Sequence, residues 1–127
     1  MIEQKADYIY TMLNAGRTGA IEACREKGVK QLGNVRDWVA AMPDVFVGSA
    51  VADSSIAFFD AVRDYARGSF KPGTIQRIGL GDPQAVRLVL ADGVAPDIKA
   101  RIAAWREDII AGRIKLPENY SGPEFTA

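Results

Sequence analysis

Residues Tyr8 to Gly33 read YIYTMLNAGRTGAIEACREKGVKQLG, and this stretch decides the fold class. Its beginning, Tyr8 to Leu13, is an apolar and aromatic run that predicts a buried β-strand. From Thr18 onward the apolar residues recur at helical spacing until Gly28, a residue type that commonly ends helices. Val29 to Gly33 then predicts a second short strand. A strand, a helix and a strand in this order predict a right-handed crossover in an α/β sheet.

The segment that follows is predicted to continue this alternation. Asn34 to Asp44 has the composition of a long loop, and Val45 to Val51 is apolar at almost every position. Such a run is typical of a parallel strand that helices cover on both faces of the sheet. Asp53 or Ser54 can cap the helix that comes next, and Gly68 marks its predicted end.

The last third of the chain is predicted to add a strand pair and one more helix. The runs Thr74 to Gly81 and Val86 to Leu90 flank a turn and predict two paired strands. Pro96 is a residue type favoured in the first turn of a helix, and Gly112 marks the end of this one. The predicted order is therefore β-α-β-β-α-β-β-α. The apolar residues expected to form the buried stripe of the last helix are Ile98, Ile102, Trp105, Ile109 and Ile110.

Three predicted loops follow the carboxyl ends of strands, which is where ligands bind in α/β sheets. These loops are Asn14 to Thr18, Asn34 to Trp38 and Ala52 to Ser54, and we expect them to lie along one rim of the sheet. The candidate ligand-binding residues in the first two loops are Asn14, Gly16, Arg17, Thr18, Asp37 and Trp38.

These residue types suit a small polar ligand, although each also has a purely structural interpretation. The turn from Asn14 to Gly19 offers backbone N–H groups at a helix N-terminus, or Thr18 simply caps that helix. Asp37 can accept hydrogens from hydroxyl or amino groups, and Trp38 offers a flat face for stacking. Trp38 can equally fold under its own loop as a small extension of the core.

Composition excludes several classes of function. The 127-residue chain contains no histidine and a single cysteine, Cys24, which we expect to pack in the core. Histidine-based metal sites, histidine-dependent catalytic triads and internal disulfides are therefore ruled out. Sixteen basic residues balance sixteen acidic ones, so the net charge does not favour binding to nucleic acid or to an anionic membrane. We expect a non-catalytic protein with no catalytic residues, no metal and no other cofactor.

Beyond these local patterns, an ordered set of segments resembles one known protein family. Ala6 to Tyr10 is similar to the family's "gaDvI" strand, and Val29 to Asp37 is similar to its "vkvIGvdxDq" segment. Val47 to Tyr65 and Gly68 to Thr74 resemble its "vltSvvkdvdkavydavk" and "GkfkgGt" segments. The family is the basic membrane protein family of ABC-transporter solute-binding lipoproteins, which includes purine nucleoside receptors.

The resemblance implies the C-terminal lobe of a type I periplasmic-binding-protein fold, a three-layer Rossmann-like α/β domain that is incomplete at its N-terminus. Residues 1–116 would form this lobe and residues 117–127 an irregular tail. The implied ligand is a nucleoside or nucleobase that two lobes clamp and deliver to an ABC permease. Asp37 matches an acidic position of the family pattern, and Asn14 to Thr18 matches its glycine-rich binding turn. Nucleoside-binding relatives can carry an aromatic residue where this chain has Ile21, so Trp38 is the candidate for stacking.

Location and assembly depend on whether the chain is part of a full receptor. As part of one, the implied location is periplasmic, or anchored to the membrane outside the cytoplasm. The chain as written has no secretory signal and would stay in the cytoplasm. The alternative function is a single-lobe regulatory or oligomeric interaction module derived from the same family. An unpaired sheet edge also predicts a homo-oligomer, because an open edge can pair with a second copy.

Overall fold

The fold is built on one four-stranded mixed sheet, in a computed structural model that describes residues 1–117, 119 and 122. β1, β2 and β3 run parallel, whereas β4 pairs with β3 in the antiparallel direction. The parallel part contains the predicted β-α-β connection, so the α/β fold class is confirmed. In their order across the sheet, the strands are β1 (Tyr8–Tyr10), β2 (Lys30–Val35), β3 (Phe46–Ala52) and β4 (Val86–Leu90).

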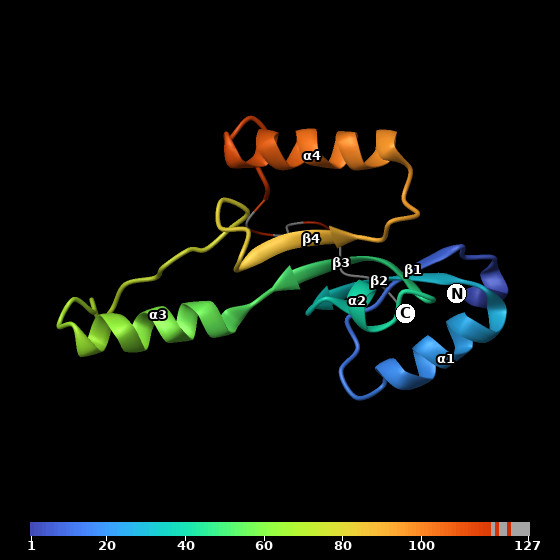
Figure 1. Ribbon diagram of the computed structural model, residues 1–127, viewed down its shortest axis with the longest axis horizontal. Coiled ribbons are helices and arrows are strands. Elements are labelled where there is room, and N and C mark those ends of the chain that lie inside the picture. The colour runs from blue at the N-terminus through green and yellow to red at the C-terminus, as the bar shows by residue number, and fades with distance from the viewer. Residues whose placement is uncertain (118, 120–121, 123–127) are drawn as a thin grey trace.

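The helices lie on both sides of this sheet and beyond its end. Within the described residues they are the 3-10 turn η1 (Ile2–Gln4), α1 (Arg17–Lys27), α2 (Trp38–Ala41), α3 (Ser54–Ala66) and α4 (Pro96–Ile110). Figure 1 shows α1 and α4 on opposite sides of the sheet, while α3 extends away from the end of β3. The predicted helix ends are largely confirmed: α1 stops at Gly28, which has a left-handed φ of 69°, and Asp53 caps α3.

The hydrophobic core lies between α1 and the parallel strands. α1 contributes Ile21 and Cys24, both buried, so the expected packing of the cysteine is confirmed. The strands contribute Ile9 from β1 and Phe46 from β3. Gln31 of β2 is also fully buried, and its Nε2 donates to a backbone carbonyl of α1 at 2.9 Å. This hydrogen bond satisfies the buried amide and ties β2 to α1.

The opposite face of the sheet is covered only in part. Because side chains alternate along a strand, Val47 points away from Phe46 and lines a cavity of about 560 Å³ with Ile98 and Ile102 of α4. α4 stands over β4 at the edge of the sheet (Figure 1), and none of its residues is buried. Tyr8 of β1 also points to this face and is 63% exposed. One face of the sheet thus carries a closed core and the other an open one.

Two predictions for the second half of the chain are wrong. Thr74 to Gly81 forms no strand. This segment returns from α3, which has carried the chain away from the sheet, and Ile75 within it is 90% exposed. β4 therefore pairs with β3 instead of with this segment. The stripe predicted to be buried on α4 is half exposed, with Trp105 at 53%, because little of the sheet lies beneath that helix.

The remaining differences concern the bounds of elements. β1 stops at Tyr10 instead of Leu13, and the predicted loop at residues 34–44 contains the end of β2 and all of α2. Residues 118, 120–121 and 123–127 of the predicted tail lie outside the described residues.

Candidate functional site

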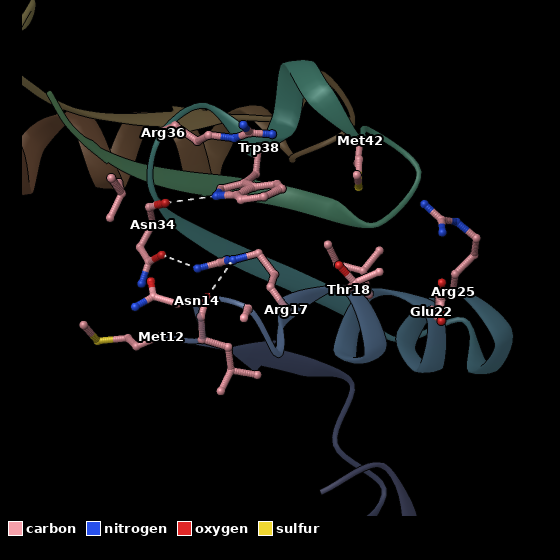
Figure 2. A pocket seen from close by; sticks show the side chains of 14 residues that line it. Met12, Asn14, Arg17, Thr18, Glu22, Arg25, Asn34, Arg36, Trp38 and Met42 are labelled. Carbon is pink, nitrogen blue, oxygen red and sulfur yellow. Dashed lines mark hydrogen bonds between the residues drawn. The ribbon is translucent and has the colours of Figure 1, made fainter.

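The carboxyl ends of β1 and β2 meet at one edge of the sheet, as parallel neighbours do, and a cavity of about 780 Å³ opens there. Figure 2 shows the side chains of this rim cavity, which come from the β1–α1 loop, α1, the end of β2 and α2. Four of the six predicted ligand-binding residues line it: Asn14, Arg17, Thr18 and Trp38. The other lining residues are Met12, Leu13, Ala15, Ile21, Glu22, Arg25, Asn34, Val35, Arg36 and Met42.

Arg17, the first residue of α1, reaches from that helix across to the end of β2. Its side chain is buried, with only 7% of the residue exposed. Nε donates to the carbonyl of Leu13 at 3.0 Å, and Nη2 donates to Oδ1 of Asn34 at 2.6 Å. Nη1 is buried and has no hydrogen-bond partner among the described residues. The guanidinium is therefore held firmly by two groups while one of its nitrogens stays unsatisfied.

Asn34 connects the three segments that build the rim. Its Oδ1 accepts from Arg17, and its Nδ2 donates to the carbonyl of Thr11 at 3.1 Å. Its own carbonyl accepts from Nε1 of Trp38 at 3.0 Å. The β1–α1 loop, β2 and α2 are thus joined through one buried amide, a role that the sequence-based prediction of a loop at this position missed. A polar residue at the end of a buried strand was the available signal.

The backbone at Val35 is strained. Its φ is 71°, a left-handed value that is rare for a β-branched residue. The N–H of Arg36 bonds the carbonyl of Asn34 at 2.9 Å, which closes a tight three-residue turn around Val35. This turn directs Asn34 into the rim toward Arg17 and sends Arg36 over α2. Strain of this kind persists only where the surroundings enforce it, and it is often found at functional sites.

The indole of Trp38 lies between two arginines. The guanidinium carbons of Arg17 and Arg36 lie 4.6 and 4.1 Å from the ring centroid, and Figure 2 shows the two groups on either side of the ring. The indole also stacks on Phe46, with the ring centroids 5.3 Å apart. Trp38 is thus both an extension of the core, as one sequence-based interpretation held, and part of the cavity wall.

Gly33 makes room for this indole. A Cβ at this position would lie 2.6 Å from Cδ1 of Trp38 and 2.8 Å from Oγ of Ser49, too close for any side chain. Ser49 is itself fixed, because its hydroxyl donates to the carbonyl of Arg36 at 2.6 Å. A glycine in β2 is therefore a condition for the position of Trp38.

The charges at the mouth of the cavity are unevenly balanced. Arg25 forms an ion pair with Asp44, with Nε to Oδ2 at 2.6 Å. This hydrogen bond holds the pKa of the Asp44 carboxyl below its ordinary value and raises the pKa of Arg25. Arg17 and Arg36 have no such carboxylate among the residues that the structure describes. Of the described residues that line the cavity, Glu22 is the single acidic one.

The third predicted loop, Ala52 to Ser54, borders a second cavity of about 300 Å³ beside the first. Val35 and Arg36 separate the two cavities, since both residues line each of them. Asp53 lies here with its pKa lowered, because it accepts hydrogen bonds from the hydroxyl and the N–H of Ser55. The three loops therefore follow one rim, as expected from the strand order.

Two of the predicted ligand-binding residues, Asp37 and Gly16, do not line the rim cavity. The third residue, Thr18, lines it but does not cap α1. Asp37 lines the second cavity and caps α2, since its Oδ1 accepts from the N–H of Ala40 at 2.9 Å. Gly16 is the N-cap of α1, so the alternative in which Thr18 caps this helix is wrong. Thr18 is exposed and faces the first cavity instead.

Comparisons with known proteins agree with this architecture. A family model described as "ABC transporter substrate-binding protein PnrA-like" matches residues 1–120. A transcriptional activator of the comK gene from Bacillus halodurans aligns with a TM-score of 0.74 at 15% identity, over 86% of this chain and 38% of that one. A solute-binding protein of an ABC transporter system from Conexibacter woesei DSM 14684 aligns with a TM-score of 0.63 at 22% identity, over 91% and 39%. No curated protein matches the chain.

These two structural similarities show the fold alone, because both identities are below 25%. The chain spans less than two fifths of the length of either matched structure. No group of three or more cysteine, aspartate or glutamate side chains within the described ranges is placed to hold a metal ion. No helix of the described part is long and apolar enough to span a membrane.

Proposed function

Because the chain belongs to the family of PnrA-like ABC transporter substrate-binding proteins, we propose that its rim cavity binds a nucleoside or nucleobase for transport. The observation that carries this proposal is the junction of Arg17, Asn34 and Trp38 at the carboxyl ends of parallel strands, the usual ligand position in such sheets. A cavity of about 780 Å³ is of the size that small-molecule ligands occupy.

The residues of the rim suit a flat heterocycle with polar substituents. A base can stack on the planar guanidinium of Arg36, which covers one face of the Trp38 indole. Asn14 and Thr18 offer hydrogen bonds near the start of α1, and the N–H groups around Gly16 add to them. Asp37, which lines the neighbouring cavity, is the proposed acceptor for sugar hydroxyls.

A single lobe should bind such a ligand weakly. Stacking and one charge-assisted hydrogen bond together supply on the order of 3 to 5 kcal/mol, which corresponds to dissociation constants in the millimolar range. In a two-lobed receptor the second lobe would supply the remaining contacts. Delivery to an ABC permease and a location outside the cytoplasm belong to the same proposal, because they require the rest of such a receptor.

We propose binding without catalysis. The chain has no histidine, and its one cysteine is buried. The rim holds no pair of opposed titratable side chains among the described residues, since Glu22 is the one acidic group of its lining. The regulatory alternative is not favoured, because the similarity to a transcriptional activator at 15% identity concerns the fold alone.

A second copy of the chain is the proposed partner for α3. This helix has no buried residue, and its exposed apolar side chains are Phe58, Phe59, Val62 and Tyr65. Its charged side chains Asp60, Arg63 and Asp64 pair with one another within the helix, which leaves the apolar side chains available for contact with a second copy. The open edge at β1 offers a further place for pairing.

Sedimentation velocity over a range of concentrations tests this association. We expect the average sedimentation coefficient to rise with protein concentration, and we expect Phe58→Lys to remove that rise. Ile75→Lys is the matched control, because Ile75 is also a largely exposed apolar residue but lies outside α3. A chain that stays monomeric at tens of micromolar would end this part of the proposal.

An NMR titration of the 15N-labelled chain with adenosine, guanosine and adenine tests the binding proposal. The expected result is a saturable shift of the amides of residues 14–19 and 34–38. Gly33→Ala should weaken these shifts, because its Cβ removes the space for Trp38, a residue of the cavity wall, although Gly33 itself does not line the cavity. Shifts confined to α4 would show that the ligand binds at another face.

A further inference from the structure

Arg17 is a buried cation without a counter-ion. Only 7% of the residue is exposed, and no carboxylate among the described residues pairs with its guanidinium. Its partners are a backbone carbonyl, an amide oxygen and an indole face, and all of them are neutral. Buried charges in proteins are normally paired, because an isolated one is costly. The orphaned Nη1 therefore marks a position where an acceptor from outside the chain would be favourable.

Arg36 adds a second cation to the same place. Its guanidinium lies 4.1 Å from the Trp38 ring centroid, and no ion pair involves it within the described part of the chain. Arg25 also lines the cavity, but Asp44 already neutralises it. The unbalanced positive charge is thus concentrated around Trp38.

The start of α1 contributes in the same direction. This helix of 11 residues begins at Arg17 and has Gly16 as its N-cap, with no side chain capping it and no acidic residue in its first turn. The N–H groups and the helix dipole at this end favour an anion. A buried guanidinium with a free nitrogen at the same end makes the site more than a bare helix terminus.

We propose that the solute bound at the rim cavity carries an anionic oxygen group, a carboxylate or a phosphate, which Arg17 and Arg36 hold beside Trp38. This inference rests on the proposed solute-binding function and replaces a neutral nucleoside or nucleobase with a nucleotide or an acidic heterocycle. Nη1 of Arg17 can donate to either group, and the exposed guanidinium of Arg36 can form two parallel hydrogen bonds with it. Since Nη1 is shielded in the structure, the side chains around it must shift when an anion binds to it.

Two pairs of probes, each matched in its ring, test the inference by NMR titration at low salt. Adenosine and adenosine 5′-monophosphate differ by a phosphate, while uracil and orotate differ by a carboxylate. We expect the anionic member of at least one pair to bind tenfold or more tightly than its neutral partner. The pair that shows the difference identifies the anion. The amide shifts should cover residues 14–19 and 34–38, and added salt should weaken the anionic ligand selectively.

Variants distinguish anion binding at this site from a general electrostatic effect of the protein's charge. Arg17→Met and Arg36→Gln should each remove most of the preference for the anionic ligand. Arg113→Gln makes the same charge change at an exposed residue that is paired with Asp108, and it should leave the preference intact. Arg36→Gln alone decides the matter if Arg17→Met does not fold, because Arg36 is exposed.

The outcomes distinguish this inference from the proposed function. Equal affinity for both members of each pair would overturn the anionic solute and leave neutral solute binding in place. An anionic preference that survives both variants would also overturn it. No shift at the rim with any of the four probes would overturn solute binding at this site, and the anion proposal with it.

Discussion

The two helices α1 and α3 differ in what their apolar residues contact. α1 places Ile21 and Cys24 against the parallel strands, where both are buried. α3 has a similarly spaced apolar stripe, yet Phe58 is 74% exposed and no residue of the helix is buried. Figure 1 shows the reason, because α3 leaves the sheet at the end of β3 and has no strand beneath it.

An apolar stripe therefore predicts a helix but does not show what the stripe packs against. Most helical stability comes from such packing and little from helix propensity. The region around α1, β1, β2 and β3, which also holds the rim cavity, should therefore contribute most of the free energy of unfolding. The region of α3 and α4 should contribute little as long as its apolar residues stay uncovered.

The largest expected effect comes from truncating an aromatic ring in each region. Phe46→Ala should cost about 3 to 5 kcal/mol of unfolding free energy, because Phe46 is fully buried. Phe58→Ala should cost less than about 0.5 kcal/mol, because Phe58 is exposed. Urea denaturation at low protein concentration measures both. Similar costs for the two variants would mean that α3 is packed in solution, which would contradict the difference between α1 and α3.

A smaller effect is expected from adding one methyl group to each face of the sheet. Gly33→Ala would force atoms of Trp38 and Ser49 apart and should cost about 2 to 3 kcal/mol. Gly48→Ala meets the flexible ends of Leu32 and Leu90 at 3.0 and 3.3 Å, so its cost should stay below about 1 kcal/mol. Thermal unfolding of both variants gives the ranking. The opposite ranking would show that the face under α4 is the tighter one.

The smallest expected effect is a gain in stability at Val35. Glycine tolerates the φ of 71° found there, so Val35→Gly should raise the free energy of unfolding by about 1 kcal/mol. Val35→Ala keeps a Cβ and should change stability much less. A loss of stability in Val35→Gly would show that this turn is not strained.

Much of the parallel half could be predicted from the sequence, since the order of strands and helix caps is a local property. Gly28 and Asp53 end and begin helices for reasons that their neighbours alone supply. The rim position of Asn14 to Thr18 and Asn34 to Trp38 followed from the direction of parallel strands.

The rest depended on contacts that the sequence does not display. Arg17 and Asn34 are 17 positions apart, and nothing local to either residue indicates their hydrogen bond. Trp105 was predicted to be buried because its helix is amphipathic, but its exposure depends on how little sheet lies beneath α4. The predicted strand from Thr74 to Gly81 failed for a similar reason, since α3 carries that segment away from any partner.

We propose that the solute binds at the rim around Trp38 and not in the region of α3 and α4. The chain has two tryptophans, so Trp105→Phe leaves Trp38 as the only reporter and Trp38→Phe leaves Trp105. Fluorescence titration of both variants with adenosine and with adenosine 5′-monophosphate compares the two regions directly. We expect a saturable change in the emission of Trp38 and none in that of Trp105. A saturable change at Trp105 with a silent Trp38 would contradict it.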